Sequence, residues 1–304
     1  MRVLITGVSG FVGTHLARHL AAQGHQVSGT YIRGAPDLDG IDLFDVDLLD
    51  QAGLTHAVAS SQPEVIVHLA GLSHVGESFA RPADYFRINV LGTENLQNAA
   101  PGIRLLAASS AEVYGAVAAG DQPIAESRSL APQSPYALTK AAMERLVLAQ
   151  GAVIVRSFNI VGPGQAQTFA LPAFAMQLAA IRAQRQEPVL AVGNLSARRD
   201  FVHVDDAVRA YEVLLAEAEE GGIYNLGSGE AYSIEEVLQR LIQTSGVSPS
   251  VEVDPERCRP IDLPLLQADN RRLRELGWVR SRDLDDALGD LWQSTLAVGS
   301  TPNT

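Results

Sequence analysis

The first 24 residues place a glycine-rich turn between a short apolar strand and an amphipathic helix. The strand reads RVLIT, the turn contains Gly7, Gly10 and Gly13, and the helix carries Leu16 and Leu20 on one face. In such a unit one glycine permits the sharp turn, a second lets backbone N–H groups approach a phosphate, and a third lets the helix pack closely on the sheet. The spacing therefore predicts a dinucleotide-binding unit at the start of a parallel sheet.

The following segments alternate short β-branched runs with longer amphipathic runs. Strands are predicted at 25–31, 40–48, 64–71, 103–110 and 152–158, and helices at 11–24, 50–63, 82–100 and 134–150. Alternation of this kind is typical of a parallel sheet with helices on both faces, because right-handed crossovers carry each helix back over the sheet. We predict an α/β, doubly wound (Rossmann) sheet with a smaller C-terminal substrate-binding lobe.

The pattern becomes irregular after Asn159, where prolines interrupt it. We therefore expect residues 1–158, together with about 197–222, to form the dinucleotide-binding domain. Residues of about 159–196 and 223–304 are expected to form the lobe. The final stretch, 299–304, is expected to fray.

Charge and composition narrow the class of ligand. The chain has 23 Lys and Arg residues against 35 Asp and Glu residues, with no basic run, which disfavours nucleic acid and anionic membranes. Cys258 is the only cysteine, so intramolecular disulfides and cysteine-based zinc sites are excluded, and no histidine spacing suggests a metal. No leader or membrane-length apolar run stands out, so a cytoplasmic location is expected.

The second strand favours one dinucleotide over the other. NAD sites usually end this strand with an acidic residue, whereas here Arg33 follows, as suits a 2′-phosphate, so NADP(H) is predicted. Asp47 is expected either near the adenine or as the N-cap of the next helix. The predicted cofactor contacts are Gly7, Gly10, Phe11, Val12, Gly13, Arg33, Asp47, Leu48, Leu69, Ala70, Gly71, Tyr136 and Lys140.

Tyr136 and Lys140 stand four residues apart at the start of a predicted helix, so they share a face. Ser110 closes the strand before it, at the edge where ligands bind in doubly wound sheets. We predict that Lys140 and an oxidised cofactor lower the pKa of the phenol, which exchanges a proton with a substrate oxygen held by Ser110. The alternative is an ordinary amphipathic helix with a solvated lysine.

Several motifs together resemble the extended short-chain dehydrogenase/reductases, which act on nucleotide-diphosphate sugars. The motifs are the glycine turn, HLAG at 68–71, Ser110, the Tyr136/Lys140 pair and RSFNIVGPGQ at 156–165. Within that family, FNIVGPGQ, VGNLSARRDFVHVDDAVRAY and RCRPIDLPLL are similar to GDP-6-deoxy-D-mannose reductases, with GDP-mannose 4,6-dehydratases as near relatives. The resemblance implies that Asn159 contacts the phosphates of the sugar nucleotide and that Arg199 and Arg259 pair with the diphosphate or the nearby ribose. Ser110 at its strand end and Ser73 in the loop beside the cleft complete the expected substrate site.

The two arginines in that set have simpler alternatives. Arg199 is expected either to pair with the diphosphate or to form a salt bridge with Asp200 or Asp205, and Arg259 either to bind the ligand or to be a surface charge.

Glu112 leaves the reaction open. It matches the glutamate that the dehydratases carry after this strand, where a carboxylate serves as general base. The short chain favours NADPH-dependent reduction of a 4-keto-6-deoxy-hexose, of the type that converts GDP-4-keto-6-deoxy-D-mannose to GDP-D-rhamnose. Dehydration of GDP-mannose with Glu112 as base ranks second and 4-epimerisation third, while a redox sensor without turnover is the alternative outside enzymes. The expected catalytic residues are Ser110, Glu112, Tyr136 and Lys140.

The remaining expectations concern supporting elements. Segment 72–82 is expected to be a loop beside the cleft, and no catalytic role is assigned to His74. Asn89 is expected to support the sheet. The resemblance also implies a homodimer in which helices at about 83–100 and 134–150 pair through residues such as Val90, Leu91 and Leu146.

Overall fold

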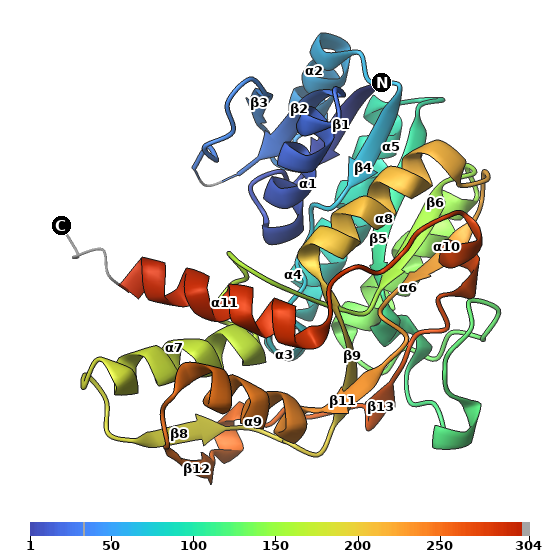
Figure 1. Cartoon of the computed structure of the whole chain (residues 1–304). Coiled ribbons are helices and arrows are strands. Elements are labelled where there is room, and N and C mark those ends of the chain that lie inside the picture. Colours follow the sequence, from blue (N-terminus) through green and yellow to red (C-terminus); the bar gives the residue numbers. More distant parts are fainter. Residues whose placement is uncertain (33, 300–304) are drawn as a thin grey trace.

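A seven-stranded parallel sheet forms the centre of the computed structural model, which describes residues 1–32 and 34–299 (Figure 1). The strand order is β10-β6-β5-β4-β1-β2-β3. The order reverses between β1 and β4, which is where doubly wound sheets open a crevice for ligands. The predicted doubly wound sheet is confirmed. The strands are β1 (Arg2–Thr6), β2 (Gln26–Tyr31), β3 (Asp42–Asp45), β4 (Val65–His68), β5 (Arg104–Ser110), β6 (Val153–Ser157) and β10 (Ile223–Leu226).

Helices cover both faces of this sheet because alternate strand residues point to opposite sides. Val3 and Ile5 of β1 pack under α1 (Phe11–Ala22) and α8 (Val204–Glu217). Leu4 lies on the other face, in the core formed with α2 (Gln51–Ser61), α5 (Gly92–Ala99) and α6 (Pro135–Leu148). The central strands β1 and β4 therefore carry apolar runs, at residues 3–5 and 65–67, as expected of strands buried on both faces.

A second core lies in the lobe below the sheet (Figure 1). Trp292 of α11 (Leu284–Gly299) is packed with residues of α7 (Ala170–Arg182) and α9 (Ile234–Ser245). The lobe strands are β7 (Asn159–Val161), β8 (Val189–Val192), β9 (Arg198–His203), β11 (Ala231–Ser233), β12 (Ser250–Val253) and β13 (Leu265–Leu266). The shorter elements are α10 (Arg271–Glu275), η2 (Ala111–Tyr114), η3 (Ala119–Asp121) and η4 (Pro255–Arg257).

Two strands lie across the domain boundaries expected from the sequence. β10 falls in a segment expected in the lobe, but it pairs in parallel with β6 as an edge of the main sheet. β9 falls in a segment expected in the dinucleotide-binding domain, but it pairs with β7, β11 and β13 of the lobe. Which sheet a short strand joins depends on its tertiary neighbours, so local sequence does not assign β9 or β10.

The long helix predicted at 82–100 is divided by a wider turn. It consists of α4 (Pro82–Phe86), the π-helical segment η1 (Arg87–Leu91) and α5. Asn89 lies in the π segment, where its amide exchanges hydrogen bonds with the Leu72 backbone at 2.8 and 3.0 Å and donates to the Thr139 hydroxyl at 3.0 Å. Asn89 thus ties this helix to α6 and to the chain after β4, in line with its expected supporting role.

The segment expected to be a loop contains a short helix, α3 (Val75–Ala80). The His74 ring accepts a hydrogen bond from the Glu77 backbone N–H at 3.0 Å and so caps the helix. Histidine is not among the usual N-cap residues, so the sequence does not indicate this role. Of the end expected to fray, 299–304, Gly299 is the last residue of α11, and residues 300–304 lie outside the described residues. Within 1–32 and 34–299 we find no helix whose length and hydropathy would let it cross a bilayer.

Candidate active site

The glycine turn forms a cradle between β1 and α1. Gly7 has φ of +71°, and a Cβ there would lie 2.8 Å from the Ala70 Cα. The Gly10 N–H donates to the Gly7 carbonyl at 3.0 Å, and a Cβ on Gly13 would overlap that same carbonyl. The first turn of α1 has no side-chain cap and no acidic residue. Its free N–H groups and positive dipole end fit a phosphate group.

The chain after β4 lies against this cradle. Leu69 N–H donates to the Thr6 carbonyl at 3.2 Å and Ala70 N–H to the Thr6 hydroxyl at 3.3 Å. A Cβ on Gly71 would lie 3.8 Å from the Lys140 Nζ. The structure therefore brings the predicted residues 69–71 between the glycine turn and the predicted catalytic lysine.

The remaining predicted cofactor residues differ in placement. Phe11 and Val12 open α1 beside the turn, whereas Leu48 is buried in the core under α5. Asp47 is exposed and accepts from the Leu49 N–H at 2.9 Å, but the cap of α2 is Asp50, so the N-cap interpretation of Asp47 is wrong. A place for Asp47 near the adenine stays a prediction, and Arg33 lies outside the described residues.

Tyr136 lies at the start of α6, which Ser134 caps by accepting the Ala137 N–H at 3.1 Å. Its ring packs edge-on against Tyr85, and only 7% of the residue is exposed. Burial raises the pKa of the phenol above its ordinary value, while the hydrogen bond with Ser110 acts in the opposite direction. The predicted lowering of this pKa is therefore not found within the chain, and Tyr136 holds its proton.

Lys140 is buried one helical turn further along α6. Its Nζ donates to the Ala108 carbonyl at 2.8 Å, next to Ser109 and Ser110 on β5. Burial lowers its pKa to about 8, and the charge of Glu144 opposes that shift. Lys140 is also the only lysine in the chain, since the rest of the 23 basic residues are arginines. The sequence alone therefore singles out Lys140, independently of its spacing from Tyr136.

A hollow of about 580 Å³ opens in the lobe, beside the carboxyl ends of the strands. Three predicted substrate residues line it: Asn159, Arg199 and Arg259. Among the residues described, Ser110 and Tyr136 do not contribute to its lining, and neither does Ser73, which is exposed. His74, which the sequence did not mark as catalytic, does line it, and its Nε2 lies 3.0 Å from the Thr168 carbonyl.

Arg199 has a partner that the sequence did not suggest. Its guanidinium pairs with Asp262 at 2.5 Å and donates to the Leu263 carbonyl at 2.6 Å, so the expected salt bridge with Asp200 or Asp205 is wrong. Asn159 donates to the Asp200 carbonyl at 3.1 Å. Asp262 follows Arg199 by more than sixty residues, and only the pairing of β13 with β9 brings their segments together.

Glu112 connects the sheet to the lobe. It lies in η2, directly after β5, and its Oε1 is 3.8 Å from an Arg259 guanidinium nitrogen. Burial raises the pKa of Glu112, while the charges of Arg259 and Arg199 act to lower it. Arg259 is therefore more than an isolated surface charge, because it faces the carboxylate that matches the dehydratase base.

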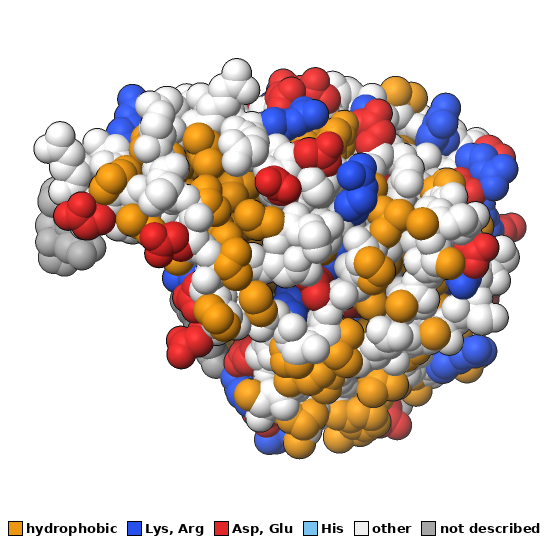
Figure 2. Space-filling view, turned by 90° about the horizontal axis from the view of Figure 1, so that it is seen from below, with side chains coloured by type: hydrophobic (Ala, Val, Ile, Leu, Met, Phe, Trp, Pro, Cys, Tyr) orange, Lys and Arg blue, Asp and Glu red, His pale blue; other side chains and the backbone are white. Residues whose placement is uncertain are grey.

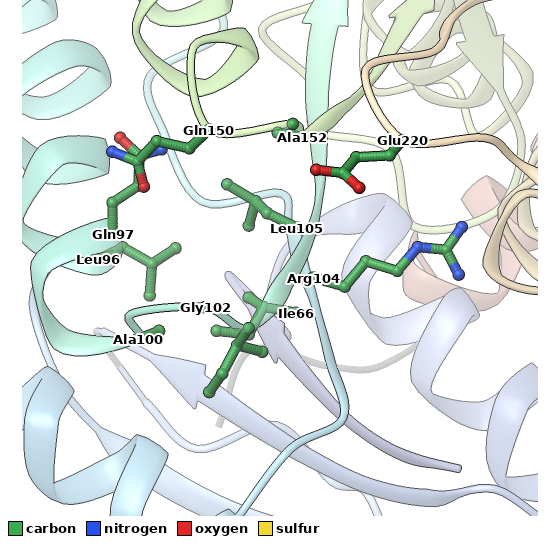
Figure 3. A pocket seen from close by; sticks show the side chains of 12 residues that line it. Ile66, Leu96, Gln97, Ala100, Gly102, Arg104, Leu105, Gln150, Ala152 and Glu220 are labelled. Carbon is green, nitrogen blue, oxygen red and sulfur yellow. The ribbon is translucent and has the colours of Figure 1, made fainter.

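Another hollow, of about 500 Å³, lies at the opposite edge of the sheet (Figure 3). Gln97 and Gln150 lie together on one side of it, and Arg104 extends away from them. The Arg104 guanidinium donates to three carbonyls at the end of α8. This hollow is remote from the glycine turn and from Tyr136, so we do not assign the chemistry to it.

His203, Asp205 and Asp290 are close enough to suggest a metal site. However, the His203 Nδ1 accepts the Asp205 N–H at 3.0 Å and its Nε2 lies 3.2 Å from Asp290. Asp290 also pairs with Arg282. The His203 ring and the Asp290 carboxylate therefore have polar partners within the protein, and we do not assign a metal site to these three residues.

Comparison with known proteins places this geometry in a family. The profile of the family described as GDP-mannose 4,6 dehydratase matches residues 4–291. The chain belongs to that family. It is 35% identical over 288 residues to the GDP-6-deoxy-D-mannose reductase of Pseudomonas aeruginosa, covering 91% of each protein. It is 28% identical to the UDP-glucose 4-epimerase of Bacillus subtilis, covering 96% of each.

Two solved structures of relatives share the fold. The structure of RMD from Pseudomonas aeruginosa complexed with NADPH matches with a TM-score of 0.85 and 32% identity, over 98% of this chain and 100% of that one. The UDP-glucose 4-epimerase of Thermus thermophilus, in complex with NAD, matches with a TM-score of 0.89 and 30% identity, over 99% and 100%. The resemblance to extended short-chain dehydrogenase/reductases is thus confirmed, and the chain is an enzyme of this group.

Proposed function

We propose that this GDP-mannose 4,6 dehydratase family member is a reductase. It uses NADPH to reduce the 4-keto group of a nucleotide-diphosphate 4-keto-6-deoxy-hexose, with GDP-4-keto-6-deoxy-D-mannose as substrate and GDP-D-rhamnose as product. The observation that carries the proposal is the placement of Tyr136 next to Ser110 and one helical turn before the buried Lys140, whose Nζ donates to the Ala108 carbonyl at 2.8 Å on the same strand as Ser110. Similarity to a GDP-6-deoxy-D-mannose reductase and to RMD, solved with NADPH, supports it.

The cradle formed by Gly7, Gly10 and Gly13 fits the pyrophosphate of a dinucleotide, because any side chain there would fill it. NADPH, when bound, supplies the hydride for the carbonyl carbon. Residues 69–71 are proposed to lie along the cofactor and Lys140 to hold the nicotinamide ribose.

The proton comes from the chain itself. A phenol whose pKa is raised by burial is an acid at neutral pH, so Tyr136 donates its proton to the C4 oxygen as that oxygen gains charge. Ser110 donates a hydrogen bond to the same oxygen and holds it in place. The buried Lys140 ammonium stabilises the phenolate that remains.

The diphosphate is proposed to enter the lobe hollow lined by Asn159, Arg199 and Arg259. A guanidinium can donate two hydrogen bonds to a phosphate, so Arg259 would exchange its 3.8 Å contact with Glu112 for the ligand. Arg199 is already paired with Asp262, and we propose that its guanidinium offsets the negative charge of that carboxylate in the lining of the hollow.

A cytoplasmic location remains a prediction.

One observation favours a second candidate function. The pKa of Glu112 is raised by burial, which suits a general base for dehydration of GDP-mannose. Pairing with Arg259 works against that role, because the arginine stabilises the carboxylate and turns it toward the lobe.

The absorbance of NADPH separates these functions. Consumption of NADPH with GDP-4-keto-6-deoxy-D-mannose supports the reductase. Conversion of GDP-mannose without net NADPH loss identifies a dehydratase, and interconversion of 4-epimers with NAD identifies an epimerase. NADPH binding without turnover on any of these sugars points to a redox sensor and contradicts the proposal.

Replacing Glu112 with glutamine tests its role in the reductase. We expect the rate of NADPH oxidation with the 4-keto sugar to fall by less than about tenfold, because reduction needs no base at this position. The measurement is the initial rate under saturating substrate, with Arg259→Gln as the matched variant of the partner. A loss as large as that of a Tyr136 variant would mean that Glu112 is part of the catalytic acid–base machinery.

A homodimer is also proposed. Phe86, Leu91 and Leu138 are about half exposed on α4, η1 and α6, the helices predicted to pair. Val90 and Leu146 are partly exposed on the same elements. Figure 2 shows apolar side chains gathered along one edge of the face seen from below. Apolar groups on adjacent helices favour association through a four-helix bundle.

The double substitution Leu91→Asp with Leu138→Asp should convert the dimer to a monomer, because each subunit would bring two carboxylates, four in all, into an apolar interface. Light scattering after gel filtration gives the mass. Val279→Asp is the matched control, since Val279 is 72% exposed and lies before α11, away from these helices. A double variant that keeps the mass of the unmodified protein would refute this interface.

A further inference from the structure

Glu144 lies one helical turn after Lys140 on α6, and it is almost completely buried. Its Oε1 accepts hydrogen bonds from the Ser109 hydroxyl at 2.5 Å and the Arg156 Nε at 3.0 Å, and its Oε2 accepts from the Arg156 Nη2 at 2.7 Å. The carboxylate is thus held by two elements of the sheet, β5 and β6. Three hydrogen bonds, two of them from the Arg156 guanidinium, therefore satisfy this buried carboxylate within the protein.

Lys140 and Glu144 contact successive residues of the same strand. Lys140 donates to the Ala108 carbonyl at 2.8 Å, and Glu144 accepts from the next residue, Ser109. Ser110, which follows, hydrogen-bonds with Tyr136. Three consecutive positions of β5 therefore meet three successive turns of one face of α6.

We propose that Glu144 is a positioning residue, whose buried carboxylate keeps the Lys140 ammonium charged and seated on β5 beside Tyr136. The proposal rests on the proposed function of Lys140 as an ammonium. It assigns to Glu144 a role that its ion pair with Arg156 does not by itself require.

The electrostatics around Lys140 support this assignment. Burial alone disfavours the ammonium and brings the pKa of Lys140 down to about 8, and Glu144 is the charge that opposes it. His68 of β4 adds no positive charge near Lys140, because burial lowers its pKa to about 3 and leaves the ring neutral. Nearby ionisable groups on the packed elements include Tyr136 on the same helix, Glu112 in η2, paired with Arg259, and Arg156, which pairs with Glu144 directly. Burial raises the pKa of the Tyr85 and Tyr114 phenols on α4 and η2, so these two groups add no charge at neutral pH.

Because Lys140 is the only lysine, its titration can be observed directly. Protein grown with ¹³C-labelled lysine has a single Cε resonance, whose shift follows the protonation of Nζ. No sugar substrate is needed. In the unmodified protein we expect the midpoint at about pH 8.

Two substitutions of Glu144 separate charge from shape. Glu144→Gln keeps the size and removes the charge, so the midpoint should fall by about one pH unit, a tenfold change in proton affinity. Glu144→Asp shortens the side chain and keeps the charge, so the midpoint should stay closer to that of the unmodified protein. A residue that only fills space would give the reverse order.

Glu144→Gln leaves the buried Arg156 without its counter-ion, which destabilises the fold. A second variant therefore removes both members of the ion pair. The double variant Glu144→Gln with Arg156→Gln removes both charges of the ion pair. Loss of the Arg156 cation raises the pKa of Lys140 and loss of Glu144 lowers it, so the midpoint should lie between those of Glu144→Gln and of the unmodified protein. Asp206→Asn is the control: Asp206 is a fully buried carboxylate that accepts the Ser281 and Arg282 N–H groups, and its loss should leave the Lys140 midpoint unchanged.

The pH at which kcat/KM for NADPH-dependent reduction falls on the alkaline side should shift together with the titration midpoint of the Lys140 Cε resonance. The sign follows from the charge: a lower lysine pKa means that the ammonium is lost at lower pH, so activity declines at lower pH. An unchanged Cε midpoint in folded Glu144→Gln protein overturns the inference. A shifted midpoint in a protein without reductase activity would instead reject the proposed function and leave the coupling between Glu144 and Lys140 standing.

Discussion

Tyr136→Phe should lower kcat for reduction of the 4-keto sugar by about a thousandfold, within the range of a lost general acid. The ring packs edge-on against Tyr85 and would stay in place, because only the hydroxyl is removed. The expected result is therefore a folded protein with nearly unchanged affinity for NADPH. Stopped-flow or steady-state NADPH absorbance gives kcat, and quenching of NADPH fluorescence gives the affinity.

Tyr85→Phe is the matched control for this change. The Tyr85 hydroxyl donates to the His74 carbonyl at 2.6 Å, so its loss costs a hydrogen bond in the same apolar cluster without touching the proposed acid. We expect this variant to keep most of its turnover and to lose on the order of 1 kcal/mol of stability. Equal losses of kcat in the two variants would show that Tyr136 acts through packing, and the assignment of the proton donor would fail.

Gly7→Ala should weaken NADPH binding by at least about a hundredfold, or roughly 2.7 kcal/mol. The new methyl group would lie 2.8 Å from the Ala70 Cα, and neither backbone segment can move without opening the seam between β1 and β4. The space that a pyrophosphate needs would close at the same time. Isothermal titration with NADPH and thermal unfolding measure the two effects separately.

Gly24→Ala distinguishes this crowding from backbone strain. Gly24 has φ of +81°, close to the +71° of Gly7, but nothing lies within 4 Å of the position that its Cβ would take. Both variants carry the strain of a left-handed alanine, about 1 kcal/mol or somewhat more. Only Gly7→Ala should lose NADPH. Similar affinities in the two variants would refute the assignment of the cofactor cradle to the glycine turn.

The parts of the fold that sequence predicts well are those with local causes. Runs such as RVLIT and VIVH are buried on both faces, and their composition alone indicates strands of a parallel sheet. The end of β1, the end of β4 and Ser110 fall at one edge because all of these strands run in the same direction. Tyr136 and Lys140 share a helix face by periodicity, so their convergence with Ser110 also follows.

The parts that sequence misses depend on partners far away in the chain. The pairing of Arg199 with Asp262 requires β13 beside β9, and no local pattern indicates it. The same holds for β10, which joins β6 at the edge of the main sheet. The predicted lowering of the pKa of Tyr136 by Lys140 and an oxidised cofactor stays a prediction. In the chain alone, burial of the phenol raises this pKa, and burial is a tertiary property that local sequence does not show.

A chain with a single, buried lysine has one more practical property. Acyl-transfer reagents such as N-hydroxysuccinimide esters attack uncharged amines that they can reach, and the only ε-amine here is covered by β5 and α6. Acylation of that amine therefore requires a local opening of the contact between the two elements. The rate of acylation under native conditions reports how often α6 separates from β5, and bound NADPH should slow it.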